Sequence, residues 1–385
     1  MISCGEPSGD LYAGALTTEL RRIDPAIVVT GFGSDRLRAA GASLIGDFSG
    51  LSVTGLLEVA RILPRTYVAY RRLVADAVAT RPDVLVAIDF PDFNFTLAKA
   101  LRKLGVPIVY YVSPQLWAWR RGRMRTMRRI ADRVLVIFPF EVPIYEAAGV
   151  PVQWVGHPLL DVADTPQPRR ARFAALGLAE ERPVVALLPG SRGNEVRAIL
   201  PDLVRAATLI RARMPGVQFV VARAPHLADG AFAPLTALGR EETGEGRVMV
   251  VEGRSDDVLA SADVALVASG TVTVQAALHE CPMVVVYRLS PLTYRLGKPF
   301  IHVHTYAMVN LIAGRRVVPE LIQEAFTPEA VAAEALRVLS DPMHAAGVRR
   351  ELTRVKSLLG EPGASRRAAE AVLEVARAGR GSPLG

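Results

Sequence analysis

The chain has 385 residues, half of them hydrophobic, with a formal net charge of +8 and a sequence pI near 9.8. This composition is sufficient for two domains with buried cores. The two cysteines, Cys4 and Cys281, lie far apart and exclude a disulfide framework or a cysteine-based zinc cluster. Neither an apolar run of about 18 residues nor a signal-peptide pattern is present, which predicts a cytoplasmic protein.

Short β-branched runs alternate with amphipathic helical runs in the first half of the chain. The predicted strands are 26–33, 83–90, 107–113, 133–138 and 152–156. The predicted helices are 11–23, 56–80 and 95–105. This alternation is typical of a parallel sheet with crossover helices.

The alternation stops at the polar, proline-bearing stretch 164–172, which predicts a linker, and then starts again. Further strands are predicted within 183–193, 218–225, 247–253, 264–270 and 282–288, with helices beginning near Glu195, Asp256 and Thr271. The predicted α/β organisation is one Rossmann-like domain over 1–163, a linker, a second over 173–342, helices over 343–378 and a disordered tail over 379–385. We expect the two sheets to face an interdomain cleft.

Three glycine-bearing turns precede predicted helices: GEPSGD from Gly5, LPGSRGNEV from Leu188 and VASGTVTVQAAL from Val267. Helix N-termini offer unpaired amides and a positive dipole end, so such turns are ready sites for phosphate. A lone glycine turn is more often only a turn. Two in one domain, with Arg192 in one and Ser269 and Thr271 in the other, favour a diphosphate site.

Known nucleotide and hydrolase fingerprints are absent. The chain has no GxxxxGK[ST], its GFGSDR segment lacks the third glycine of GxGxxG, and Ser191 in PGSRG does not form a G-x-S-x-G elbow.

The segment IDFPDFN closes a hydrophobic strand with two carboxylates. For Asp92, as for Asn94, helix capping is the simplest interpretation. Asp89 stands at the end of the strand itself, so its carboxylate is the candidate general base. Glu6 and Asp10 in the first turn could share that role or order the loop around a sugar.

Two other features have both a structural and a functional interpretation. The arginine-rich stretch Arg120–Arg129 follows Trp117 and Trp119 and is either a solvated helix face or a patch facing phosphate or membrane. His157 in VGHP is more typically a satisfied hydrogen-bonding residue, and we keep it only as a candidate cleft residue.

Seven segments occur in the order seen in lipid-A-disaccharide synthases: GEPSGDLYAGAL, IDFPDFN, YYVSPQLWAWR, VGHP, LPGSRGNEV, SGTVTVQAALHECPMVVVYR and VNLIAGRRVVPELIQ. The chain closely resembles that family from Gly5 to about Gln323. The resemblance implies a GT-B glycosyltransferase of family 19. Its expected reaction joins UDP-2,3-diacylglucosamine to 2,3-diacylglucosamine 1-phosphate, with inversion and without a metal or other cofactor, to give a β-1,6 disaccharide 1-phosphate in lipid A (lipopolysaccharide) biosynthesis.

The resemblance also implies site residues. Asp89, with Glu6, is expected to be catalytic. The nucleotide-sugar site is expected to comprise Gly190, Ser191, Arg192, Glu195, Ser269, Gly270, Thr271, Gln275 and Asn310. The acceptor side is expected to comprise Ser8, Gly9, Asp10, Asp92, Asn94 and His157.

The acylated substrates require an apolar surface, which 51–73, with its interspersed arginines, could supply. An ordinary core-packing helix is the equal alternative. The functional interpretation predicts a peripheral protein on the cytoplasmic face of the inner membrane, and the C-terminal helices permit a homodimer. No nucleic-acid module is recognised.

The sequence departs from the family pattern at two notable positions. Only Met1–Cys4 precede the first turn, so the first strand is expected to be short, and Gln275 stands where the family tends to have Glu. Two alternatives to the transferase stay open. One is another GT-B enzyme, such as an epimerase or a peptidoglycan-type transferase, and the other is a non-catalytic protein that binds lipid or nucleotide-sugar.

Overall fold

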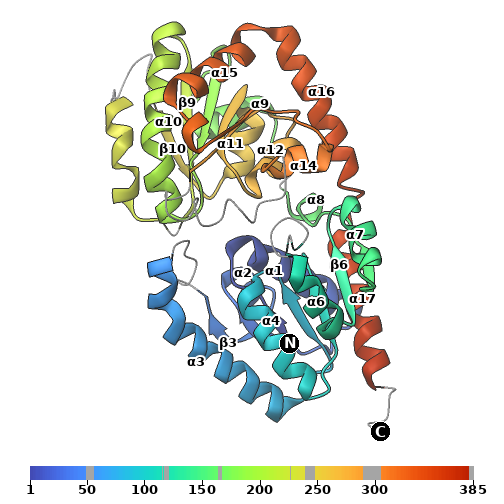
Figure 1. Cartoon of the computed structure of the whole chain (residues 1–385). Coiled ribbons are helices and arrows are strands. Elements are labelled where there is room, and N and C mark those ends of the chain that lie inside the picture. Colours follow the sequence, from blue (N-terminus) through green and yellow to red (C-terminus); the bar gives the residue numbers. More distant parts are fainter. Residues whose placement is uncertain are drawn as a thin grey trace. The chain divides into compact units, whose positions relative to one another are not determined.

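The computed structural model describes residues 1–48, 56–114, 116, 121–163, 167–225, 227–238, 248–288 and 305–380 (Figure 1). These residues form two compact units. The first comprises Met1–Val162 and the segment that begins at Leu359, and the second comprises the described residues from Ala163 to Leu358. Each unit contains its own parallel sheet and its own core.

The first unit is built on a seven-stranded sheet of order β3-β2-β1-β4-β5-β6-β7, in which every pairing is parallel. Its strands are β1 Ile2–Ser3, β2 Thr30–Gly33, β3 Ser43–Asp47, β4 Leu85–Ile88, β5 Ile108–Tyr111, β6 Arg133–Val136 and β7 Val152–Trp154. The central strands β4 and β5 are buried at every position. Continuous apolar runs of this kind are expected where helices cover both faces of a sheet.

The helices of the first unit are α1 Pro7–Ile23, α2 Asp35–Ala39, α3 Leu56–Thr80, α4 Pro91–Lys103, α6 Met124–Ile130, α7 Val142–Ala147, α8 Leu159–Val162 and α17 Ala364–Arg380, with the 3-10 turns η1 Arg121–Arg123 and η2 Pro139–Glu141. The last helix, α17, packs against α1. Its first turn is fixed by the carboxylate of Asp161, which accepts from the backbone N–H groups of Gly363 and Ser365. A carboxylate at this position satisfies amides that have no partner within the helix.

The second unit contains a six-stranded parallel sheet of order β10-β9-β8-β11-β12-β13. Its strands are β8 Val184–Leu188, β9 Gln218–Arg223, β10 Val248–Glu252, β11 Val264–Ala268, β12 Met283–Tyr287 and β13 Glu320–Ile322. Its helices are α9 Arg169–Leu176, α10 Gly193–Arg213, α11 Ser255–Ser261, α12 Val272–Leu278, α14 Met308–Ala313, α15 Pro328–Ser340 and α16 Pro342–Leu358, with the 3-10 segments η3 Asp229–Leu238 and η5 Gln323–Ala325. Its main core joins α10 and α15 to the central strands through side chains such as Leu200, Leu266 and Val331.

The predicted α/β class with two parallel sheets is confirmed, and α3 begins and ends where the pattern predicts. Strands β3 and β13 carry no strong β-branched run, and the sequence pattern missed them. The stretch 169–172, expected in a linker, is instead the first turn of α9. Gly379 and Arg380, expected in a disordered tail, end α17, and the rest of that tail lies outside the described residues. Among the helices that the structure describes, none has the length and apolar character needed to cross a membrane.

Candidate active site

Each sheet has one switch point, at which the order of the strands across the sheet reverses. In the first unit this point lies between β1 and β4, which pair directly through Ile2 with Val86 and Ser3 with Ala87. Ligands of open α/β sheets bind at the carboxyl ends of the strands that flank such a point. The segments that follow these two strands are the predicted GEPSGD and IDFPDFN motifs.

The turn after β1 is shorter than expected. Helix α1 begins at Pro7 with Glu6 as its extended N-cap residue, so Ser8, Gly9 and Asp10 belong to the first turn of the helix. Proline at this position starts a helix readily because its missing N–H would have no partner there. Glu6 and Ser8 are half-buried, whereas Gly9 is buried.

The two motifs contact each other directly. A Cβ placed on Gly5 would lie 2.3 Å from the Phe90 ring, so only glycine allows that ring to cover the turn. Below it, the Ser3 hydroxyl donates to Asn94 Oδ1 at 2.7 Å, and Asn94 Nδ2 donates to the Ser3 carbonyl at 3.2 Å. Asn94 is fully buried. It therefore joins the two strand ends from inside the unit and is a structural link.

Asp89 immediately follows β4 and is half-buried. Asp89 and Phe90 both adopt left-handed backbone conformations, with φ of +43° and +48°. Non-glycine residues rarely adopt this conformation, and it clusters at functional sites. The turn keeps Asp89 outside helix α4, at the carboxyl end of β4.

The expectation that Asp92 caps α4 is wrong. The N-cap residue is Phe90, without a side-chain cap, and Asp92 lies in the first helical turn. Its side chain is 73% exposed and forms an ion pair with Arg123. Asp92 therefore lies at the surface beside the candidate base.

Asp10 has a different environment from Glu6. It is 4% exposed, and its carboxylate accepts from the backbone N–H groups of Ser34, Arg36 and Leu37 at 2.7, 2.9 and 3.3 Å. These amides lie at the start of α2, where the positive end of the helix dipole favours an anion. Asp10 therefore orders the β2–α2 connection.

His157 is 1% exposed and packs against the rings of Tyr12 and Phe138. Its Nδ1 accepts from the Leu159 N–H at 3.2 Å. Burial lowers the pKa of His157 to about 3, so the imidazole stays neutral near pH 7. The structure places it within the core of the first unit.

In the second unit, the strand order reverses between β8 and β11, which pair through Leu188 and Val267. The predicted turns LPGSRG and SGT follow these two strands. Both motif pairs in the chain thus lie at the carboxyl ends of the strands that flank the two switch points.

The turn after β8 leads into α10, whose N-cap residue is Arg192. Gly190 has a φ of +125°, and a Cβ there would lie 2.8 Å from Glu195 Oε2. The other oxygen of Glu195 accepts from Arg192 Nη1 at 2.8 Å. Glu195 is 9% exposed, so it supports the turn from below, while Ser191 is exposed at its tip.

The turn after β11 contains Ser269, Gly270 and Thr271, all half-buried. Gly270 has a φ of +156°, and a Cβ there would meet no atom within 4 Å. The Thr273 hydroxyl donates to the Gly270 carbonyl at 2.9 Å and closes the turn. Gln275 follows in α12 and is half-buried.

Asn310 is fully buried, and its amide makes four hydrogen bonds within the unit. Its Nδ2 donates to the Val318 carbonyl and to Glu320 Oε1 at 3.0 and 2.7 Å, and its Oδ1 accepts from the N–H groups of Val317 and Val318 at 2.8 and 3.1 Å. Glu320 also accepts from the N–H groups of Tyr306 and Ala307. This network holds the start of α14 against β13. The sequence did not single out Glu320.

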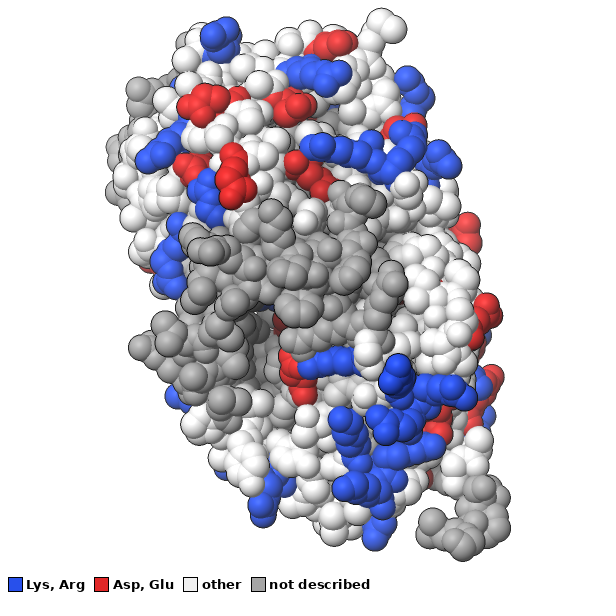
Figure 2. All heavy atoms as spheres, in the orientation of Figure 1, with Lys and Arg blue, Asp and Glu red and all other residues white. Residues whose placement is uncertain are grey.

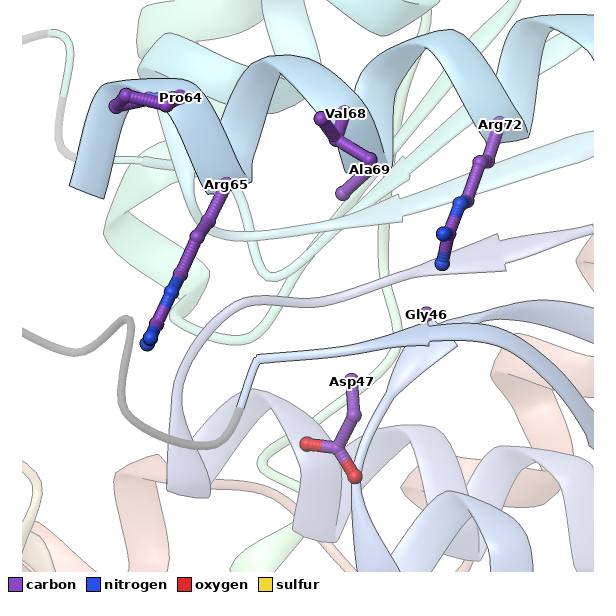
Figure 3. A pocket seen from close by; sticks show the side chains of 7 residues that line it. All are labelled: Gly46, Asp47, Pro64, Arg65, Val68, Ala69 and Arg72. Carbon is purple, nitrogen blue, oxygen red and sulfur yellow. The ribbon is translucent and has the colours of Figure 1, made fainter.

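A groove of about 360 Å³ lies between α3 and the end of β3. Its lining residues are Gly46, Asp47, Pro64, Arg65, Val68, Ala69 and Arg72. Figure 3 shows the side chains of Arg65 and Arg72 extending from α3 on the side where Gly46 and Asp47 lie. Asp47 is paired with Arg38. The groove combines an apolar surface with two cations.

Basic side chains also gather on one face of the first unit, over α4 and α6 (Figure 2). We define this basic face by six exposed residues, Lys99, Arg102, Lys103, Arg125, Arg128 and Arg129. Of the Arg120–Arg129 stretch, Arg120 lies outside the described residues, as do Trp117 and Trp119. Within the described part of the chain, no three His, Cys, Asp or Glu side chains are grouped so as to hold a metal ion.

Solved structures of similar fold include a UDP-GlcNAc 2-epimerase from Neisseria meningitidis, bound to UDP-GlcNAc, with a TM-score of 0.67 and 12% identity, covering 97% of this chain and 98% of that chain. CalG4, the calicheamicin glycosyltransferase, has a TM-score of 0.62 and 18% identity, covering 99% and 98%. At these identities the likeness concerns the fold alone. It confirms the predicted GT-B-like class.

Sequence comparison is more specific. A family model for lipid-A-disaccharide synthetase matches residues 1–375. The lipid-A-disaccharide synthase of Geobacter metallireducens is 45% identical over 376 residues, covering 97% of this chain and 96% of that protein. The corresponding protein of Myxococcus xanthus is 43% identical over 380 residues, covering 99% and 98%. The chain therefore belongs to the lipid-A-disaccharide synthase family.

Proposed function

We propose that this chain transfers the diacylglucosamine unit of UDP-2,3-diacylglucosamine to the 6-hydroxyl of 2,3-diacylglucosamine 1-phosphate. The hydroxyl oxygen attacks the anomeric carbon, the bond to the diphosphate breaks, and UDP leaves with the electron pair. The products are the β-1,6 disaccharide 1-phosphate and UDP. The observation that carries this proposal is that four motifs of the family occupy the strand ends at the two switch points.

In the first unit, Asp89 is the proposed general base that accepts the proton of the acceptor hydroxyl. Its backbone turn supports this role, because it separates Asp89 from the helical residues of α4. Glu6, half-buried across the β1–β4 boundary, is the second carboxylate of the proposed acceptor side. Asn94 acts indirectly, by donating to the Ile88 and Asp89 carbonyls, whereas Asp10 orders the β2–α2 connection.

In the second unit, the turns at Gly190–Arg192 and Ser269–Thr271 are the proposed diphosphate site. The N-terminal amides of α10 and the guanidinium of Arg192 would stabilise the charge that develops on the leaving UDP. Glu195 orients Arg192 at the start of the helix. Gln275 would accept from a ribose hydroxyl through its amide oxygen.

The lipid portion of the substrates is proposed to contact α3. Tyr67 and Val68 are 59% and 48% exposed, and the α3–β3 groove adds an apolar lining beside Arg65 and Arg72. The basic face on α4 and α6 belongs to the same unit and would attract anionic lipid headgroups. These features support peripheral attachment to the cytoplasmic face of the inner membrane.

The experiment that tests the reaction is UDP release in detergent micelles, measured with and without the acceptor. Asp89→Asn should lower kcat by about 10²-fold or more, in the range of general-base removal. Arg192→Ala should raise the KM for the donor and lower kcat. Asp35→Asn and Arg205→Ala are the matched controls, because Asp35 is a carboxylate of the same unit whose side chain is 89% exposed, and Arg205 is an arginine of α10 whose side chain is 73% exposed.

Each alternative activity gives a different result. Conversion of the donor without acceptor would indicate an epimerase or a hydrolase. UDP binding without turnover would indicate a non-catalytic binding protein. Full activity of Asp89→Asn would remove Asp89 from the role of base while leaving the transferase intact.

A further inference from the structure

The turn that presents Asp89 is held from beneath by two buried donors. The Asp89 carbonyl accepts from Tyr110 Oη at 2.9 Å and from Asn94 Nδ2 at 2.8 Å. A carbonyl oxygen has two lone pairs, so these bonds use its acceptor capacity. Asn94 also donates to the Ile88 carbonyl at 3.1 Å.

Tyr110 is well placed for this contact. It is fully buried in β5, where it pairs with Ala87 of β4, and its ring packs 5.6 Å from that of Phe95. Burial, with a further contribution from the negative charge of Asp89, raises the pKa of Tyr110 well above its usual value. The hydroxyl therefore stays protonated and remains a donor.

The backbone at the turn needs such support. Asp89 and Phe90 are consecutive non-glycine residues at positive φ, a conformation that persists only where the surroundings fix it. If the bond to Tyr110 is lost, the Asp89 carbonyl loses one of its two buried donors. The backbone then has more freedom to rotate, and the direction of the Asp89 carboxylate changes with it.

We propose that Tyr110 is a positioning residue, whose hydroxyl holds the Asp89 turn so that the carboxylate meets the acceptor hydroxyl in one orientation. The proposal rests on the proposed function of Asp89. It assigns to Tyr110 no contact with substrate. Its effect belongs in kcat, because reactivity depends on orientation to within about 1 Å.

The test is a double-mutant cycle with Tyr110→Phe and Asp89→Asn, in which kcat and both KM values are measured. Tyr110→Phe should lower kcat about 10-fold with the donor KM changed less than about twofold. In the Asp89→Asn background the same substitution should change kcat by less than about twofold, because the two effects act through one group.

Tyr145→Phe is the matched control. Tyr145 is also fully buried, and its hydroxyl bonds to Ser113 and to the Pro114 carbonyl rather than to the Asp89 carbonyl. It should leave kcat within about twofold in both backgrounds. Thermal melting confirms that each variant is folded, and a variant that melts near the assay temperature is assayed at a lower temperature.

Equal losses of kcat from Tyr110→Phe in both backgrounds would overturn the proposal, since they would show a general structural effect. An unchanged kcat in Tyr110→Phe would also overturn it. Failure of the proposed base is separate, because it would appear as full activity in Asp89→Asn alone.

Discussion

Replacement of Asp10 by alanine distinguishes a structural carboxylate from one that binds substrate. Asp10 is almost completely buried, and its carboxylate accepts three backbone N–H groups at the start of α2. Asp10→Ala removes this anion and leaves these amides without their acceptor. We therefore expect a loss of stability in the first unit, with the acceptor KM little changed.

The magnitude follows from these contacts. A hydrogen bond to a charged group contributes about 1.5–3 kcal/mol, and an anion at a helix N-terminus adds about 0.3–1 kcal/mol. Because α2 is short and partly exposed, water replaces some of the lost bonds, and we expect a net destabilisation of about 3 kcal/mol. For a unit of this size, that corresponds to a decrease in Tm of roughly 6–12 °C.

The assay is thermal unfolding of Asp10→Ala followed by circular dichroism, combined with steady-state kinetics below the melting temperature. Asp35→Ala is the control, since its side chain is 89% exposed and pairs with Arg38 at the surface, and it should lower Tm by little. An unchanged Tm in Asp10→Ala with a large rise in the acceptor KM would refute the reasoning and assign the carboxylate to the substrate.

Three further predictions concern buried groups. The unmodified protein should lose about 2 kcal/mol of stability between pH 7 and about pH 5, because below pH 6.5 the unfolded imidazole of His157 takes up a proton that the folded one, with its pKa near 3, does not. His157→Gln should abolish this loss, which urea titrations at the two pH values measure. Gly5→Ala should destabilise the first unit by about 1–3 kcal/mol and lower kcat, because the alanine Cβ would overlap the Phe90 ring. Adding Phe90→Ala to this variant should restore part of the Tm. Asn310→Ala should destabilise the second unit by about 2–4 kcal/mol in thermal melts, because the N–H groups of Val317 and Val318 lose their acceptor. Weaker UDP binding at unchanged stability would instead indicate direct contact with the nucleotide.

Much of this molecule could be predicted from local pattern. The alternation of apolar strands and amphipathic helices gave the two parallel sheets, since each strand and helix is specified by its own hydrophobic period. The glycine turns could be located too, because glycine permits the positive φ that Gly190 and Gly270 adopt. Once the strand order is known, it places those turns at the switch points of the two sheets.

Only the tertiary structure decided what the polar side chains do. Asp10 and Glu6 occupy one sequence motif, yet one is buried on the amides of α2 and the other is half-buried at the N-cap of α1. Asn310 resembles a ligand-binding residue in sequence but is fully bonded within its unit. The role inferred for Tyr110 depends on its hydrogen bond to the Asp89 carbonyl, 21 positions away, which is possible because β5 pairs with β4. A sequence specifies which groups can form hydrogen bonds, whereas their partners depend on contacts that exist only after the strands have paired.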